Sequence, residues 1–140
     1  MKILVTGGLG LIGHNVVKYM QDLGHEVVIC DTKTNYGIIP QDEIDYLMDE
    51  RMKVIGNKSF VYNYDISNGF LIDSMFNIEQ PEIVIHMASF PRQKVVNANP
   101  QLGSRVMSEG LLNLLEISKE HKLNKFVYIS SSMVYGDFLE

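Results

Sequence analysis

The sequence predicts an α/β domain built on a doubly wound parallel sheet, and three observations support this prediction. Five short apolar runs, rich in β-branched residues, are typical of buried strands. Segments with helical periodicity separate these runs, and alternating strands and helices form parallel sheets with right-handed crossovers. Polar or glycine-rich residues directly follow the runs, at the carboxyl ends where open α/β sheets bind ligands. We expect the strands in the spatial order 3-2-1-4-5.

The composition narrows the class of protein. The 140 residues correspond to one domain, and 46% of them are hydrophobic, which suits a globular α/β fold. A net charge of −5 argues against a surface for nucleic acids or anionic membranes. No apolar run approaches the roughly 20 residues of a membrane span and no signal peptide is predicted, so the cytoplasm is the expected compartment. The single cysteine, Cys30, allows no internal disulfide and is expected to be buried in a strand.

The chain begins with a predicted strand, a glycine-rich turn and a helix. The first apolar run covers Lys2–Thr6. Two overlapping glycine patterns follow it, G-x-G-x-x-G and G-x-x-G-x-x-G, formed by Gly7, Gly8, Gly10 and Gly13. Apolar residues at helical spacing continue to Leu23, and Gly24 is placed to end the helix. Glu26–Cys30 is the second predicted strand, and Asp31 directly follows it.

This order of elements favours a Rossmann-type site for a dinucleotide. Glycine lets the backbone turn sharply and approach a pyrophosphate without a Cβ, and the N–H groups at the helix start favour its negative charge. Asp31 lies eighteen residues after Gly13, where a carboxylate accepts hydrogen bonds from ribose hydroxyls. A glycine-rich turn in another kind of α/β domain is the alternative interpretation.

The remaining elements follow from the same patterns. A loop is expected over 32–40 and another over Met87–Asn99, and Asn99 is expected to cap a helix that begins at Pro100. The predicted helices are Gln41–Met52, Gly69–Asn77 and Pro100–His121, and the predicted strands are Ser59–Asn63, Ile83–His86 and Lys125–Ser130.

Two of the polar residues at strand ends have alternative interpretations. Asp65 either faces a ligand or caps the turn at Ser67–Asn68. Local hydrogen bonds are expected to hold His86 at its strand end, which disfavours it as a base. No other histidine lies near it in sequence, so no metal site is expected.

Several motifs together resemble the NAD-dependent epimerase/dehydratase family, the extended short-chain dehydrogenases that act on nucleotide sugars. The resemblance covers nearly the whole chain, in order and at the family's spacing. The segments that carry it are Thr6–Gly13, Asp31, Asp65–Ile66, His86–Ser89 and Ser130–Asp137.

The resemblance implies a role for each motif. The glycine turn, with the Leu11–Ile12 backbone, holds a pyrophosphate, and Asp31 holds the adenosine ribose with Asn35 close to it. Asp65 and Ile66, after the third strand, flank the adenine. Met87, Ala88 and Ser89 line the nicotinamide-side ribose. The implied NAD-binding residues are Gly7, Gly10, Leu11, Ile12, Gly13, Asp31, Asn35, Asp65, Ile66, Met87, Ala88 and Ser89.

The resemblance also implies the chemistry. Ser131, four residues before Tyr135, matches the family's catalytic Ser or Thr, which hydrogen-bonds the sugar oxygen at the carbon that gives up hydride. A carboxylate at Asp31 would repel a 2′-phosphate, which favours NAD over NADP. Ser132-Met133 lacks the Asp-Glu pair of the 4,6-dehydratases, which favours chemistry like that of a UDP-hexose 4-epimerase.

The chain departs from the family pattern in two ways. The family's catalytic base is the tyrosine of a Tyr-x-x-x-Lys motif, and no tyrosine of this chain has lysine four residues later. Met107 occupies a position where the family usually has asparagine. We therefore expect residues 1–140 to form an NAD-binding domain that ends before the later strands and the sugar-binding region, and to turn over little or nothing alone.

Two other functions are compatible with a glycine turn followed by a strand-end acid. The main alternative is a non-catalytic dinucleotide-binding or interaction module. A methyltransferase that binds S-adenosylmethionine also uses a glycine turn and a strand-end acid, but the Val-Tyr-Gly segment disfavours it. The expected partner of the completed enzyme is a nucleotide sugar, and the fifth strand is expected to be an exposed apolar edge that promotes self-association.

Overall fold

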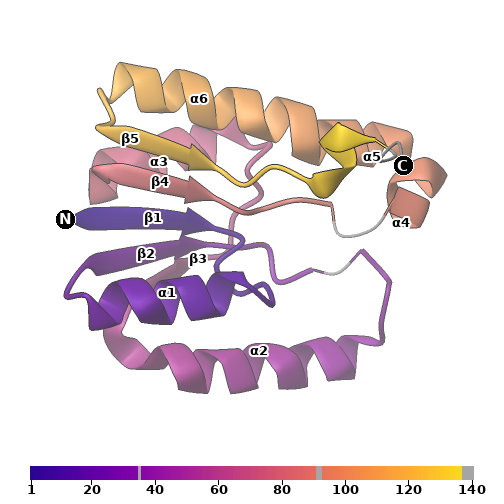
Figure 1. The fold of residues 1–140 in the computed structure, drawn as a ribbon, viewed down its shortest axis with the longest axis horizontal. Helices are drawn as coiled ribbons and strands as arrows, with labels where there is room; N and C mark the ends of the chain where they lie inside the picture. Colours follow the sequence, from indigo (N-terminus) through magenta and orange to yellow (C-terminus); the bar gives the residue numbers. More distant parts are fainter. Residues whose placement is uncertain (35, 91–92, 137–140) are drawn as a thin grey trace.

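A computed structural model describes residues 1–34, 36–90 and 93–136 of the chain. Five parallel strands form one sheet in the order β3-β2-β1-β4-β5, and helices cover both of its faces (Figure 1). The predicted architecture and strand order are thereby confirmed. The elements are β1 (Lys2–Thr6), α1 (Gly13–Asp22), β2 (Glu26–Cys30), α2 (Gln41–Ile55), η1 (Gly56–Lys58), β3 (Phe60–Tyr62), α3 (Gly69–Glu79), β4 (Ile83–His86), α4 (Gln93–Ala98), α5 (Pro100–Ser104), η2 (Arg105–Glu109), α6 (Gly110–Glu120), β5 (Lys125–Tyr128) and η3 (Ser132–Tyr135).

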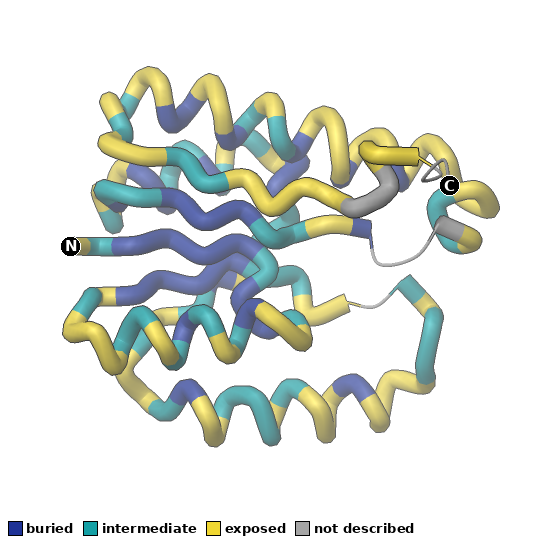
Figure 2. The backbone as a smooth tube through the Cα atoms, viewed as in Figure 1, coloured by how far each residue is buried: buried dark blue, intermediate teal, exposed yellow. Residues whose placement is uncertain are grey.

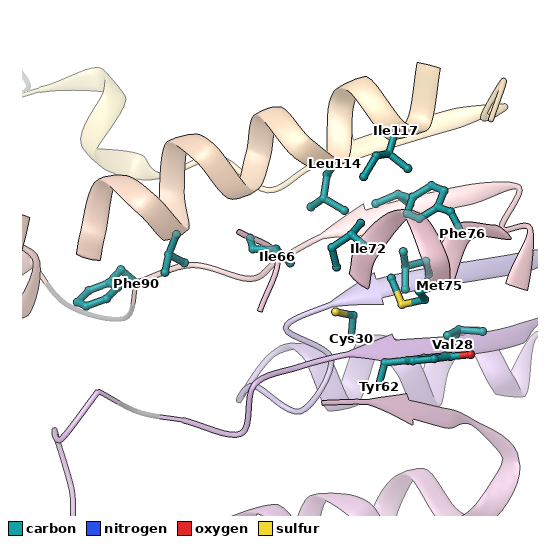
Figure 3. Packing of buried hydrophobic residues seen from close by; sticks show 13 residues of the cluster. Val28, Cys30, Tyr62, Ile66, Ile72, Met75, Phe76, Phe90, Leu114 and Ile117 are labelled. Carbon is teal, nitrogen blue, oxygen red and sulfur yellow. The ribbon is translucent and has the colours of Figure 1, made fainter. Parts of the chain in front are cut away.

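Two apolar layers hold the sheet between its helices. On one face, alternate residues of β1, β2 and β4 pack against α3 and α6, and Figure 3 shows Leu114 of α6 directed toward Ile72 and Phe76 of α3. On the other face, the remaining residues of the same strands pack against α1 and α2. Strands covered on both faces have nearly continuous apolar sequences, which is why β1, β2 and β4 match the sequence prediction to the residue.

The central strands are buried and the edge strands are more open (Figure 2). β3 and β5 are shorter than predicted, because each pairs with only one neighbouring strand. The strand ends are level across the sheet: Thr6 pairs with Cys30 and His86, Cys30 pairs with Tyr62, and His86 pairs with Tyr128. This register brings the loops that follow the strands to one edge of the sheet.

Four helical segments differ from the prediction, and one of them is α3, which extends two residues beyond Asn77 to Glu79. The predicted loop Met87–Asn99 contains the short helix α4, which has too few turns to show an amphipathic period. The single helix predicted from Pro100 contains a π turn, η2, in which the N–H of Gly110 donates to the carbonyl of Arg105. α2 extends to Ile55. Asn99 precedes α5 as predicted, but among the described residues its side chain caps no helical N–H group.

None of the helices within the described ranges is both long enough and apolar enough to cross a membrane.

Candidate functional site

A cavity of about 470 Å³ opens at the edge of the sheet where the strands end. Loops after β1, β2, β3 and β4 form its floor, and α2 with the preceding loop forms an outer wall. The lining residues are Gly7, Gly10, Leu11, Cys30, Asp31, Thr32, Thr34, Tyr36, Ile38, Ile39, Ile44, Leu47, Met48, Arg51, Tyr64, Asp65, Ile66, Met87, Ala88, Ser89 and Val106.

The glycine turn after β1 lies too close to its surroundings to carry side chains. Gly7 has a φ of +69°, its N–H donates to the Cys30 carbonyl at 2.8 Å, and a Cβ there would lie 2.7 Å from the Ala88 nitrogen. A Cβ on Gly13 would lie 2.1 Å from the Gly7 oxygen. Backbone therefore lies against backbone, and the chain leaves open the space that a ligand's phosphates need.

Asp31 connects the two loops that frame the cavity. One carboxylate oxygen, Oδ2, accepts the Leu9 N–H at 3.0 Å, and the other, Oδ1, accepts the Lys33 N–H at 2.8 Å. A carboxylate oxygen has two lone pairs, so each oxygen can accept one more hydrogen bond from a ligand hydroxyl. The position and geometry suit recognition of a ribose diol.

Arg51 of α2 contacts the same turn, a contact that none of the sequence motifs predicts. Its Nη1 donates to the Leu9 carbonyl at 2.7 Å, and the half-buried side chain lines the cavity. A signal was nevertheless present in the sequence, because Arg51 continues the helical spacing of Ile44, Met48 and Ile55, which lie on the inner side of α2.

The loop after β3 is held from two sides. Asp65 Oδ1 accepts the Ser67 N–H at 2.9 Å, as the turn interpretation predicts, and the residue also lines the cavity; its contact with a ligand stays a prediction. From α6, the Asn113 side chain donates to the carbonyls of Ile66 and Ser67 at 3.2 and 3.0 Å. Ile66 packs over Gly110, where a Cβ would lie 2.5 Å from its Cγ1.

His86 is held by local hydrogen bonds at the end of β4, as expected. The Thr6 hydroxyl lies 2.6 Å from its Nδ1 and accepts the N–H groups of Met87 and Ala88 at 3.3 Å each. Because that oxygen already accepts two bonds, it donates its own proton to Nδ1, which places the imidazole proton on Nε2. Burial lowers the pKa of His86 to about 4, so the ring is neutral at neutral pH.

Tyr36 adds an aromatic wall to the cavity. Its ring centroid lies 4.0 Å from that of Phe90, and burial raises the pKa of its hydroxyl, with the charge of Asp65 acting in the same direction. Its position in the predicted loop 32–40 gives no indication of this contact.

The structure brings most of the predicted NAD-binding residues together. Nine of them line the cavity: Gly7, Gly10, Leu11, Asp31, Asp65, Ile66, Met87, Ala88 and Ser89. Gly13 lies buried beneath the turn, and Ile12 is exposed where α1 begins. Asn35 lies outside the described residues.

Ser131 is not brought to this group. It is exposed after β5, where its carbonyl accepts the Val134 N–H at 3.2 Å, and it is not part of the cavity lining. Within the described parts of the chain, no three His, Cys, Asp or Glu side chains are grouped to hold a metal ion.

The fold and the cavity together define a parallel α/β protein with a glycine-turn ligand site. Comparison with known families then identifies its membership. Residues 3–140 match the model of the NAD dependent epimerase/dehydratase family, and the chain belongs to this family.

Two relatives and two solved structures illustrate the similarity. The chain is 32% identical over 139 residues to Protein CapI of Staphylococcus aureus, covering 97% of this chain and 39% of that protein. It is 30% identical over 138 residues to a UDP-glucose 4-epimerase of Schizosaccharomyces pombe, covering 96% of this chain and 36% of that protein. The UDP-glucose 4-epimerase of Thermotoga maritima, solved with UDP-glucose, superimposes with a TM-score of 0.81 at 26% identity. The match covers 100% of this chain and 41% of that one. The UDP-glucose 4-epimerase of Bifidobacterium longum, solved with NAD+ and UDP, superimposes with a TM-score of 0.78 at 26% identity. The match covers 97% of this chain and 38% of that one.

The chain thus spans about two fifths of the length of these relatives.

Proposed function

We propose that this chain binds NAD in the cavity and forms the NAD-binding portion of a nucleotide-sugar epimerase or dehydratase, of the UDP-hexose 4-epimerase kind. The observation that carries the proposal is Asp31, whose carboxylate lies in the cavity and accepts the N–H of Leu9 from the glycine turn. The residues present fit a dinucleotide, because the turn leaves no room for a Cβ at Gly7 or Gly13 and the carboxylate retains acceptor capacity.

Each part of the site has a separate task in this proposal. The turn from Gly7 to Gly13 and the start of α1 bind the pyrophosphate through N–H groups and the helix dipole. Among the described residues, the N–H groups of Leu11 and Ile12 have no protein partner and are available for this. Asp31 binds the adenosine ribose. Asp65 and Ile66 lie beside the adenine, and the loop 87–89 lies beside the second ribose.

The chemistry of the complete enzyme requires groups beyond those in the cavity. Bound NAD supplies a hydride acceptor for a sugar carbinol carbon. Ser131 would hydrogen-bond the sugar oxygen, but an unactivated hydroxyl is a poor base at neutral pH. A general acid–base contributes a factor of about 10²–10⁴, and no tyrosine in the chain is followed four residues later by lysine. We therefore propose that the chain alone binds NAD with little or no turnover.

Calorimetric titration with NAD and NADH tests the binding proposal. Asp31→Asn should weaken binding about tenfold to hundredfold, because it removes a charged acceptor of hydrogen bonds. Asp22→Asn is the matched control, since Asp22 is exposed on α1 and pairs with Lys18. Absence of heat with both nucleotides, or equal affinities of the two variants, would contradict the proposal.

A non-catalytic dinucleotide-binding module is the second candidate, because Ser131, the predicted catalytic residue, is not part of the cavity lining. Incubation with NAD and a panel of UDP-hexoses addresses catalysis directly. Robust turnover by the chain alone would exclude this candidate and would also show that the missing base is unimportant.

A further inference from the structure

We propose that Arg51 is a positioning residue for the dinucleotide: together with Asp31 it fixes the orientation of the Leu9 peptide groups, and through them the turn that receives the pyrophosphate. This inference rests on the proposed function. It assigns to α2 a part in ligand binding that the family motifs do not include.

Both backbone polar groups of Leu9 are bound by charged side chains from different elements. The N–H donates to Asp31 Oδ2 at 3.0 Å, and the carbonyl accepts from Arg51 Nη1 at 2.7 Å. Hydrogen bonds that involve a charged group are stronger than neutral ones. Leu9 is therefore held between the end of β2 and the inner side of α2.

The side chain of Leu9 adds a third restraint. It is fully buried, and it belongs to the apolar layer beneath α1 and α2. Rotating the Leu9 peptide groups would require breaking both charged hydrogen bonds while the side chain stays packed. The turn is consequently pre-organised, which lowers the entropy lost when a ligand binds.

The neighbouring hydrogen bonds show why this orientation matters for phosphate. The N–H of Gly10 donates to the Gly7 carbonyl at 3.0 Å, so the turn satisfies that donor internally. The next two N–H groups, of Leu11 and Ile12, have no protein partner among the described residues. Fixing Leu9 fixes the start of the segment from which these two donors project.

Arginine suits this task better than a flexible cation. Its planar guanidinium presents several N–H donors in a rigid arrangement and stays charged at all relevant pH values. One donor holds the Leu9 carbonyl while the half-buried group lines the cavity.

The experiment compares ligands with and without a pyrophosphate in matched variants. Arg51→Met removes the bond to Leu9. Lys53→Met removes one positive charge from the same helix, at an exposed residue paired with Glu50. Binding of NAD, ADP and adenosine to the wild-type chain and to both variants is measured by calorimetry, and urea unfolding verifies that each variant folds. Arg51→Lys, which keeps a charge and a donor, is used if the methionine variant does not fold.

We expect Arg51→Met to weaken NAD and ADP about tenfold and to leave adenosine within about twofold. Lys53→Met should leave all three affinities unchanged, and Arg51→Lys should fall between wild type and Arg51→Met. If Arg51→Met bound NAD as tightly as the wild-type chain does, or lost equal affinity for ADP and for adenosine, the role of Arg51 would be overturned while the proposed function would stand. Failure of the wild-type chain to bind NAD would overturn the proposed function and this inference with it.

Discussion

Replacing Gly13 by alanine tests whether the turn depends on close backbone contact. The new Cβ would lie 2.1 Å from the Gly7 oxygen and 2.9 Å from the Gly8 Cα. Ordinary carbon contacts lie near 3.5 Å or beyond, so the turn and the start of α1 must separate by about 1 Å or more.

The expected loss follows from two opposing contributions. Alanine is favoured over glycine inside a helix by about 0.5–1 kcal/mol, which would stabilise the variant. Overpacking typically costs about 1–3 kcal/mol and can cost more, and here the contact is with backbone atoms that cannot change rotamer. We therefore expect the free energy of unfolding to fall by about 2 kcal/mol and NAD binding to weaken more than tenfold.

Gly24 provides the matched control. Its φ is +82° and a Cβ there would meet nothing within 4 Å. Gly24→Ala should therefore lower the free energy of unfolding only by the cost of placing alanine at a positive φ, about 1–2 kcal/mol. Urea unfolding and calorimetry with NAD measure both variants. Gly24→Ala should lose stability and keep its NAD affinity, whereas Gly13→Ala should lose both. Wild-type affinity in Gly13→Ala would refute the close-contact argument.

Two further predictions concern pH and association. Because burial lowers the pKa of His86 to about 4 from its usual 6.5, the unfolded chain binds a proton that the folded chain does not, and stability should fall as pH decreases from about 6.5 to 4, by about 3 kcal/mol in total. Urea unfolding at pH 7 and 4.5 should show most of this loss, and His86→Asn should lack it; an equal pH dependence in both proteins would contradict the assignment. Tyr128 and Ile129 are half exposed at the β5 edge, so the chain should self-associate with increasing concentration in sedimentation experiments, and Ile129→Lys should reduce this. A monodisperse monomer at high concentration would contradict self-association through β5.

The predictable parts of this protein are those governed by local pattern. β1, β2 and β4 match to the residue because strands covered on both faces have continuous apolar sequences. The glycine turn and Asp31 were found because their chemistry requires fixed spacing along the chain. α4 was missed because six residues between a loop and Pro100 carry too little periodic signal.

The contacts that complete the site depend on tertiary packing. Arg51 reaches a turn 42 residues away, and Asn113 holds a loop 46 and 47 residues away. Neither partner is apparent from spacing along the chain, since the packing of α2 and α6 on the sheet sets both distances. Ser131 remains a prediction from its motif, because the cavity does not include it.

The pairing of β1 with β4 joins two parts of the sheet that the chain builds on opposite sides. β1, β2 and β3 precede the crossover through α3, and β4 and β5 follow it. Gly7 from the first part lies directly against Ala88 from the second, so a ligand seated there would contact both. Ligand binding would then raise the free energy needed to separate the two parts by about 2.7 kcal/mol at a ligand concentration one hundred times the Kd. Occupancy of the cavity would therefore be coupled to cooperative unfolding of the sheet through this one strand pair.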